Sequence, residues 1–340
     1  MSIRCERFRA EHLEALQRLA QRAFPERPNT PEFLRWRYLD LPEQFGELAF
    51  EGADCVAMCW GFVRPYLLGN RKVRVIEIQD WYCLPEHRGQ ATGVALLRRA
   101  MEGEEPTLTF GGSQHTVAIV SKLGWTHLGD AHHFALPLSA RVLRARRRLG
   151  SLGRPLDSAV QWWFKPASRS PRGGEVAWGP LGSDPPHPDP SGDPAAAPLI
   201  SSQMARWLAA GETFCGRYFV HRFLVDGSER GWSLARIVDT ERQRIGVILR
   251  TRTQEPAAGA REWILAELLR WLAGQGVDAV RLTVAGAEEA AAVRGLRFFY
   301  RGSSPIHSYQ QGKAVSFPRV AVGYDVSDKL LLPLAEGARR

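Results

Sequence analysis

The residues whose types and spacing could do chemistry gather in one stretch, residues 73–101 (VRVIEIQDWYCLPEHRGQATGVALLRRAM). Its beginning alternates apolar and polar residues and predicts a strand, whereas Val94, Leu97 and Met101 recur on one face of a helix. The loop between them runs from Arg88 to Gly93. The backbone N–H groups of such a loop, together with the positive end of the helix that follows, attract an anion. The stretch therefore predicts an anion site that a pyrophosphate would fill.

Two widespread phosphate-binding motifs are absent from the sequence. It contains no G-x-x-x-x-G-K-[ST], and no G-x-G-x-x-G follows a predicted strand. Binding of a nucleoside triphosphate or a dinucleotide therefore lacks its usual sequence support.

The anion loop instead resembles a family motif. Arg88-x-x-Ala91-x-Gly93 is similar to the acetyl-CoA signature R/Q-x-x-G-x-G/A of the GNAT superfamily of N-acetyltransferases. Residues 84–89 (LPEHRG) resemble the approach V-x-P-E-Y-R-G of that family, and residues 121–125 (SKLGW) resemble its later element E-K-L-G-F. Ala91 departs from the family, which usually has glycine there. Its methyl group could weaken cofactor binding at the pyrophosphate, whereas a helical backbone at this position would tolerate it.

The resemblance covers roughly residues 1–138, and one segment within it points to a subfamily. The segment FLRWRYLDLP near the start is similar to bacterial GNAT proteins associated with polysaccharide biosynthesis. What the family implies is a mixed central sheet flanked by helices, acetyl-CoA or another acyl-CoA as co-substrate, a small-molecule amine as acceptor, and no metal. The residues that the resemblance places at the cofactor are Trp81, Cys83, Arg88, Gly89, Gln90, Ala91, Thr92 and Gly93.

Transfer of an acetyl group from a thioester to an amine needs a polarised carbonyl, a deprotonated amine and a proton for the departing thiolate. In the family a backbone N–H before the loop holds the thioester carbonyl, which here implies Cys83. Glu77 and Asp80 are the candidate bases. Alternation places Glu77 on the face of Trp81 and Cys83, with Asp80 on the other face unless a bulge intervenes. Many family members place a tyrosine acid where this chain has Val120. The acid is then absent, supplied by His115 or Tyr82, or unnecessary because the thiolate leaves with the help of solvent.

The length, charge and cysteine content limit the number of domains and the kinds of partner. The chain has 340 residues, which favours two domains, and its formal charge of +9 favours an anionic partner. Five cysteines without a C-x-x-C pair predict reduced thiols, and the histidines at 127, 132 and 133 lack metal-ligand spacing. With no apolar stretch of membrane-spanning length and no signal-peptide core, we expect a cytoplasmic protein without a membrane span.

The sequence predicts an α/β (α+β) fold of two tandem GNAT-like domains. Residues 1–138 would form the domain with the acyl-CoA site, 139–198 a basic helix followed by a Pro/Gly-rich linker, and 199–340 a degenerate GNAT-like domain without a CoA motif. The sequence evidence for two related domains is a similarity between residues 218–224 and 33–39, which share arginine and aromatic positions.

Three readings stay open at this point. The first is an N-acyltransferase, with the second half shaping the acceptor cleft or a homodimer. The second is an inactive protein that binds acyl-CoA or a partner as a sensor or scaffold. The third, nucleic-acid binding through the arginines of 141–148, is not expected because no aromatic residue is interleaved with them.

Overall fold

The protein forms two compact units, and each is assembled from separate segments of the chain. In the computed structural model the described residues are 2–41, 43–68, 71–139, 173–182, 197–240, 242–253, 260–285 and 287–311. The first unit takes its described residues from 2–130, 197–214 and 304–311, and the second takes the rest. The division into 1–138, 139–198 and 199–340 stays a prediction. Each of the two units contains residues from more than one of these ranges. Most of 139–198 lies outside the described residues.

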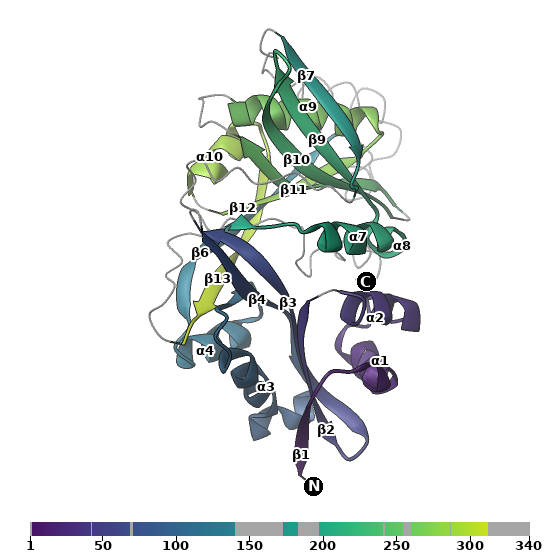
Figure 1. The fold of residues 1–340 in the computed structure, drawn as a ribbon, viewed down its shortest axis with the longest axis vertical. Helices are drawn as coiled ribbons and strands as arrows, with labels where there is room; N and C mark the ends of the chain where they lie inside the picture. Colours follow the sequence, from purple (N-terminus) through teal and green to yellow (C-terminus); the bar gives the residue numbers. More distant parts are fainter. Residues whose placement is uncertain are drawn as a thin grey trace, which may run out of the picture. The chain divides into compact units, whose positions relative to one another are not determined.

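A mixed sheet is the centre of the first unit (Figure 1). Its strands are β1 (Ile3–Arg7), β2 (Gln44–Glu51), β3 (Asp54–Leu68), β4 (Arg71–Cys83) and β5 (Thr107–Phe110), in that spatial order. The first four pair antiparallel, whereas β4 and β5 are parallel. The short strand β8 (Ala197–Pro198) pairs with β3.

Helices flank this sheet on both faces. They are α1 (Leu13–Ala23), preceded by the 3-10 turn η1 (Ala10–His12), α2 (Pro31–Tyr38), the 3-10 helix η2 (Pro85–Gln90), α3 (Thr92–Met101), α4 (Gln114–Lys122), α7 (Ser202–Ala210) and α8 (Glu212–Cys215). The rings of Tyr38 and Trp207 contact Trp60 and Phe62 of β3, so α2 and α7 cover one face. Helix α3 covers the opposite face, because a Cβ on its Gly93 would meet Cys83.

The second unit repeats this plan. Its strands are β7 (Gly174–Pro180), β9 (Arg217–Val225), β10 (Ser228–Asp239), β11 (Arg244–Thr253) and β12 (Ala279–Ala285), and its helices are α9 (Ala260–Gly274) and α10 (Ala287–Gly295). Helix α9 packs on one face through Leu265, Leu268 and Leu272, which share an apolar core with Ile248 and Val280. Order and pairing therefore give the mixed central sheet flanked by helices that the sequence predicted.

The two halves of the chain exchange their last strands. Strand β6 (Thr126–Pro137) follows the first half in sequence, but its residues Ala131–Pro137 pair with β12. Strand β13 (Phe299–Tyr309) ends the second half, and its residues Ile306–Tyr309 pair with β5. This exchange is the reason why the compact units do not follow the linear order of the sequence.

The structure corrects two local expectations. Residues 217–225 form strand β9, whereas residues 33–38 lie in helix α2. The similarity between 218–224 and 33–39 therefore does not mark equivalent elements. Helix α2 instead resembles α7, which it contacts: Thr30 and Ser201 cap the two helices, and the indoles of Trp36 and Trp207 stack at 4.6 Å and each donate to the other's carbonyl. Residues 174–180, expected in a linker, form strand β7 beside β9.

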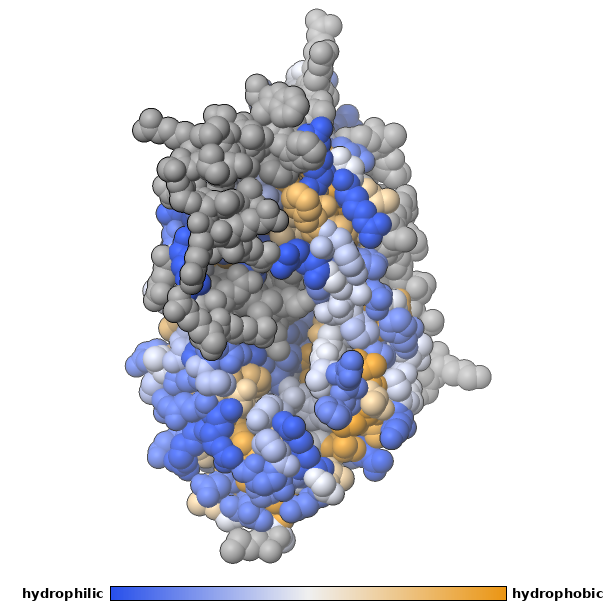
Figure 2. Space-filling model, turned by 180° about the vertical axis from the view of Figure 1, so that it is seen from behind, coloured by the Kyte–Doolittle hydropathy of each residue, from blue (hydrophilic) through white to orange (hydrophobic). Residues whose placement is uncertain are grey.

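The described part of the chain shows five free cysteines, of which Cys55, Cys59 and Cys215 are buried. None of its helices is long and apolar enough to cross a membrane. On the face drawn in Figure 2, hydrophilic residues cover most of the described surface, with smaller apolar groups between them.

A histidine on β9 is enclosed in the core of the second unit. His221 lies edge-on against Trp271 at 4.3 Å, and neither of its ring nitrogens has a hydrogen-bond partner among the described residues. Burial lowers the pKa of His221 to about 4, because the charged imidazolium would lose its solvation.

The unfolded chain therefore binds more protons than the folded chain between about pH 6.5 and pH 4. Stability is lost as pH falls through this window, and at pH 5 the loss from His221 should be about 2 kcal/mol. Replacing His221 with phenylalanine should remove this loss. Urea unfolding at pH 7 and pH 5 measures it, and an equal pH dependence in both proteins would refute the assignment.

Candidate functional site

A bulge in β4 sets the geometry of the site. Opposite Gly61 of β3 the register shifts, so that Ile78 and Gln79 of β4 together face one residue. A side chain at Gly61 would collide with the carbonyl of Glu77, so the bulge requires a glycine there. Because one residue is inserted, Asp80 lies on the same face as Glu77, whereas Trp81 lies on the other. Simple alternation had placed Trp81 beside Glu77, and the structure corrects this.

Beyond the bulge, β4 and β5 stop pairing. Their last parallel partners are Ile78 and Thr109, yet β4 continues to Cys83. The edge of β4 from Gln79 to Cys83 is therefore no longer joined to β5. An edge of this kind presents backbone donors and acceptors to whatever lies beside it.

The hydrogen-bond alternation shows which groups face this open edge. Leu84 donates its N–H to Val56 of β3 at 2.9 Å, so in the antiparallel ladder Tyr82 also points toward β3. The N–H groups of Trp81 and Cys83 therefore point away from β3, toward the open edge. The Nε of Arg88 donates to the carbonyl oxygen of Cys83 at 3.0 Å, which agrees with this direction.

Helix α3 begins beside this edge without a capping side chain. Helices α2, α4 and α7 begin after Thr30, Ser113 and Ser201, whose hydroxyls accept a backbone N–H, but α3 begins after Ala91. The first N–H groups of a helix have no partner within it. The hydroxyl of Thr92 is buried and has no hydrogen-bond partner among the described residues. A helix N-terminus of this kind is suited to an anion.

Ala91 has a left-handed backbone, with φ 58° and ψ 15°. The backbone here is not the helical one that would tolerate the methyl group. The family's glycine has a physical reason, since a Cβ in this conformation crowds the following carbonyl oxygen. The alanine therefore carries strain directly before the uncapped N-terminus of α3.

Replacing Ala91 with glycine should relieve this strain and raise the free energy of unfolding by about 1 kcal/mol. The matched control is Ala95→Gly one turn later, at an exposed position inside α3, where glycine should cost about 1 kcal/mol. Urea denaturation measures both. Equal losses in the two variants would contradict the strain at Ala91.

The two glycines of the loop have different surroundings. A Cβ on Gly93 would lie 3.2 Å from the Cβ of Cys83 and 3.4 Å from the indole nitrogen of Trp81. That indole also donates to the carbonyl of Gly93 at 2.7 Å. Gly93 thus lets α3 pack closely on β4. Gly89 is exposed with nothing within 4 Å of a Cβ, and Gln90 beside it is also exposed.

The thiol of Cys83 is half-buried on the face covered by α3. Burial raises the pKa of this thiol, so it stays protonated at neutral pH. The contribution of Cys83 to the open edge is therefore its backbone rather than a thiolate.

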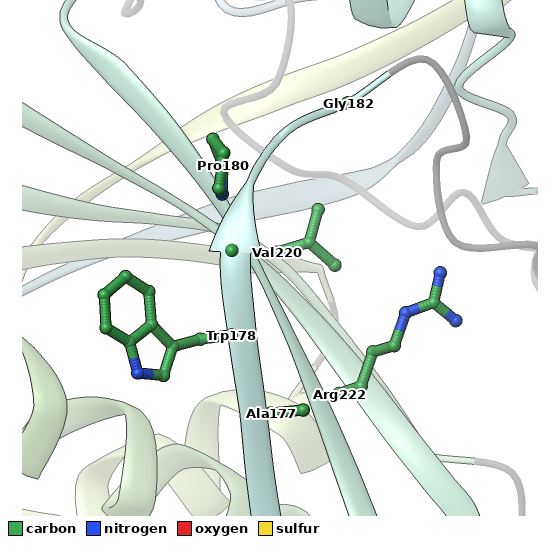
Figure 3. Close-up of a pocket in the computed structure, with 7 residues that line it drawn as sticks. Ala177, Trp178, Pro180, Gly182, Val220 and Arg222 are labelled. Atoms are coloured by element: carbon green, nitrogen blue, oxygen red, sulfur yellow. The ribbon is translucent and has the colours of Figure 1, made fainter.

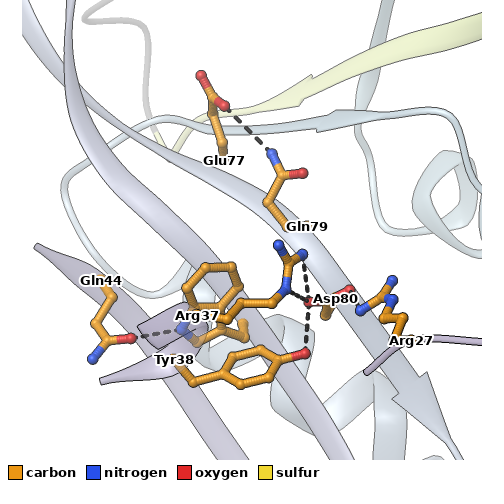
Figure 4. A network of polar contacts seen from close by, with 8 residues as sticks. Arg27, Arg37, Tyr38, Gln44, Glu77, Gln79 and Asp80 are labelled. Carbon is orange, nitrogen blue, oxygen red and sulfur yellow. Dashed lines mark hydrogen bonds and ion pairs between the residues drawn. The ribbon is translucent and has the colours of Figure 1, made fainter. Parts of the chain in front are cut away.

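Asp80 is the centre of a buried ion-pair cluster (Figure 4). One carboxylate oxygen accepts from Arg27 at 2.8 Å, and the other accepts from Arg37 at 2.8 Å and from the hydroxyl of Tyr38 at 2.9 Å. The carboxylate is 1% exposed. Burial, followed by the charge of Asp80, raises the pKa of Tyr38 far above its usual value. These contacts tie α2 and the loop before it to β4.

Glu77 has a second set of partners on the same face. Its Oε1 accepts from the Nε of Arg64 at 2.7 Å and from the hydroxyl of Tyr66, and its Oε2 accepts a long bond of 3.4 Å from Gln79. Glu77 is also 1% exposed. The link through Gln79, the half-buried bulge residue, connects Glu77 to the start of the open edge.

Sequence reasoning brought Glu77, Asp80 and the α3 loop together, but it missed the cations and hydroxyls that hold the carboxylates. Arg64 and Tyr66 come from β3, and Arg37 and Tyr38 come from α2. The sequence signal that could have disclosed these partners is a basic residue inside an otherwise apolar segment, such as Arg64 in β3. His115 is exposed at the start of α4, and none of the described contacts joins it to Glu77 or Asp80. Val120 is buried in the same helix.

The parallel strands that separate, the bulge and the uncapped helix N-terminus together form a candidate site for an anionic group beside a strand edge. Residues 13–103 match the family model described as acetyltransferase (GNAT) family. This match places the first part of the chain with the GNAT acetyltransferases, and the fold of the whole chain is that of tandem GNAT proteins.

Solved structures share this fold. A GCN5-related N-acetyltransferase from Anabaena variabilis has a TM-score of 0.59 at 11% identity, covering 90% of this chain and 72% of that one. A tandem GNAT protein from the clavulanic acid biosynthesis pathway has a TM-score of 0.55 at 13% identity, covering 92% of this chain and 100% of that one. A glucosamine N-acetyltransferase region of a fungal multi-domain β-N-acetylglucosaminidase has a TM-score of 0.55 at 12% identity, with coverages of 91% and 38%. A comparison of the sequence with curated proteins finds no match.

Proposed function

We propose that the protein is a CoA-dependent N-acyltransferase that moves an acetyl group from acetyl-CoA to the primary amine of a small molecule. The observation that carries this proposal is the open edge of β4, which presents two backbone N–H groups directly before an uncapped helix N-terminus. A thioester bound along such an edge can have its carbonyl polarised while its pyrophosphate lies at the helix end.

In this proposal the N–H of Cys83 holds the thioester carbonyl oxygen, and Trp81 offers a second donor on the same edge. The residues proposed to hold the rest of the cofactor are Arg88, Gly89, Gln90, Ala91, Thr92 and Gly93. The acceptor nitrogen attacks the carbonyl carbon, the C–N bond forms and the C–S bond breaks. The amine loses one proton, and the departing thiolate takes one up.

Glu77 is the better of the two proposed bases. Gln79 connects it to the open edge, whereas both oxygens of Asp80 are held by arginines. Asp80 and His115 remain proposals, and His115 is the acid that solvent exposure would permit to reach the departing thiolate. Glu77→Gln keeps the size of the side chain and should lower kcat more than it raises KM if the carboxylate takes the proton.

We propose an amino sugar or an amino acid as acceptor. The charge of +9 favours an acceptor with an anionic group. The amino-sugar option also agrees with the printed activity of one structural neighbour, the glucosamine N-acetyltransferase region. A panel of amino sugars, amino acids and simple amines with acetyl-CoA tests this, with release of the free thiol as the readout. Turnover with any of these acceptors supports the proposal.

A second candidate function is a sensor or scaffold that binds acyl-CoA without turnover. Ion pairing of both carboxylates favours it, since a carboxylate held by arginine is a poor proton acceptor. Binding of acetyl-CoA with no thiol release from any amine in the panel would mark this case and exclude the transferase.

A further inference from the structure

Strand β7 lies at the edge of the sheet of the second unit. It pairs with β9 along one side, and no described strand pairs with its other side. The N–H of Leu181 donates to the carbonyl of Tyr218 at 3.0 Å, and the carbonyl of Gly173 accepts from Asp226 at 3.2 Å. Backbone groups alternate along an antiparallel strand, so the odd-numbered residues from 173 to 181 point them toward β9. The residues whose backbone groups point to the open side are Gly174, Val176, Trp178 and Pro180.

This open edge has little of the protection that sheet edges usually carry. Charged side chains, prolines and bulges commonly keep other strands away from an edge. Glu175 is the one charged residue of β7, and Pro180 stands at the end of the strand, where it removes no bond to β9. Trp178 is 53% exposed, although its ring contacts Trp271 of α9. The edge is therefore a template to which a further strand can pair.

The backbone of β7 is complementary to that of a second copy. All seven residues of the strand pair in an antiparallel ladder when Ala177 lies opposite Ala177 of the second copy. Val176 then lies opposite Trp178 of the other copy and exchanges two backbone hydrogen bonds with it. The N–H of Gly174 meets the carbonyl of Pro180. Two-fold symmetry repeats each of these bonds, and the donor that proline lacks falls at the end of the ladder.

The side chains on the face of α9 agree with this register. Val176 packs against the apolar cluster that includes Trp263, and Trp178 contacts Trp271 on the same face. In the paired strands each Trp178 would lie beside Val176 of the other copy. Aromatic and β-branched side chains form favourable cross-strand pairs, so the pairing would cover the exposed tryptophan.

On the opposite face the same register brings opposite charges together. Figure 3 shows a pocket at this edge, with Arg222 on the other side of the strand from Trp178. Glu175 of the second copy would lie opposite Gly179, which lines this pocket together with Arg222 and has no side chain to fill it. One nitrogen of Arg222 donates to Glu229 at 2.9 Å, and a guanidinium has five N–H donors. The pocket thus has room and positive charge for the carboxylate of the second copy.

We propose that the protein forms a homodimer in which β7 pairs antiparallel with β7 of a second copy, centred on Ala177. Strands β9 and β7 of both copies then form one continuous sheet. Each copy uses its open edge once, so the assembly closes at two copies. The dimer depends neither on acyl-CoA nor on the activity proposed for the first unit.

Sedimentation equilibrium of the full chain without ligand measures the association. We expect a dimer that dissociates on dilution. Glu175→Arg brings a second cation to Arg222 and should raise the dissociation constant of the dimer at least about tenfold. The matched control is Glu104→Arg, which makes the same change of charge at an exposed position between α3 and β5 and should associate as the wild type does. A monomeric wild type, or equal dissociation constants in all three proteins, would overturn the proposal.

Ala177→Cys tests the register of the paired strands. Ala177 and its copy would form a non-hydrogen-bonded pair, with Cα atoms about 4.5 Å apart, a separation that a disulfide can bridge. With oxidised glutathione as oxidant, the two thiols should lose two electrons and two protons and link the copies. Gly179→Cys is the control, because there is room for its side chain but it would face Glu175 rather than a second thiol. No cross-link at 177, or equal yields in both variants and the wild type, would overturn the proposed pairing.

Discussion

Replacing Cys83 with proline is expected to lower kcat by about 10²–10³-fold while the protein stays folded. Proline removes the backbone N–H that we propose to hold the thioester carbonyl. That N–H faces the open edge rather than β3, so no hydrogen bond of the sheet is lost. Thiol release at saturating acetyl-CoA and acceptor measures the change.

The matched control is Cys83→Ala, which removes the thiol but keeps the N–H. It should retain kcat within a few-fold, because the half-buried thiol takes no part in the proposed reaction. Circular dichroism and thermal unfolding establish that both variants are folded. A folded proline variant with wild-type kcat would refute the role of this N–H, and an inactive alanine variant would point to the thiol instead.

Replacing Asp80 with alanine is expected to cost about 3–5 kcal/mol of folding stability. The change leaves the buried cations Arg27 and Arg37 without the carboxylate that holds them and removes the partner of the Tyr38 hydroxyl. Urea denaturation at neutral pH measures the loss. Asp40→Ala, two residues after the end of α2, is the control, because this exposed carboxylate pairs with Arg35 at 3.6 Å and should contribute under about 1 kcal/mol.

A loss below about 1 kcal/mol in Asp80→Ala would contradict the structural role. Asp80→Asn separates structure from chemistry, since the amide keeps the shape and part of the hydrogen bonding. If this variant is stable yet loses kcat, Asp80 is the base after all. If stability and activity fall together, its contribution is to hold α2 against β4.

Local chemistry in the sequence predicted most of the first half. The strand, loop and helix succession was read correctly because alternation, a proline turn and helical spacing follow one another directly in 73–101. Gly61 could have disclosed the bulge, since glycine inside a strand often marks one. Simple alternation takes no account of the bulge and places Asp80 on the face opposite Glu77, whereas Asp80 lies on the same face as Glu77.

What the sequence could not disclose depends on contacts between distant segments. The exchange of β6 and β13 leaves no local pattern, because each strand has the same composition whichever sheet it joins. The left-handed backbone of Ala91 is set by the loop around it, and an alanine in the sequence gives no sign of that conformation. The pairing of Arg64 with Glu77 likewise arises only when β3 and β4 align.

The most direct test of the account is calorimetric titration of acetyl-CoA against wild type, Gly89→Asp and Gly89→Asn. Gly89 is exposed with room for a side chain, unlike Gly93, where a side chain would strike Cys83 and Trp81. A carboxylate there should repel the pyrophosphate at the start of α3, whereas the amide of the same size should not.

We predict that wild type and Gly89→Asn bind acetyl-CoA, and that Gly89→Asp binds it at least about tenfold more weakly at unchanged thermal stability. No binding by the wild type, or equal affinity in all three proteins, would contradict an acyl-CoA site at this loop.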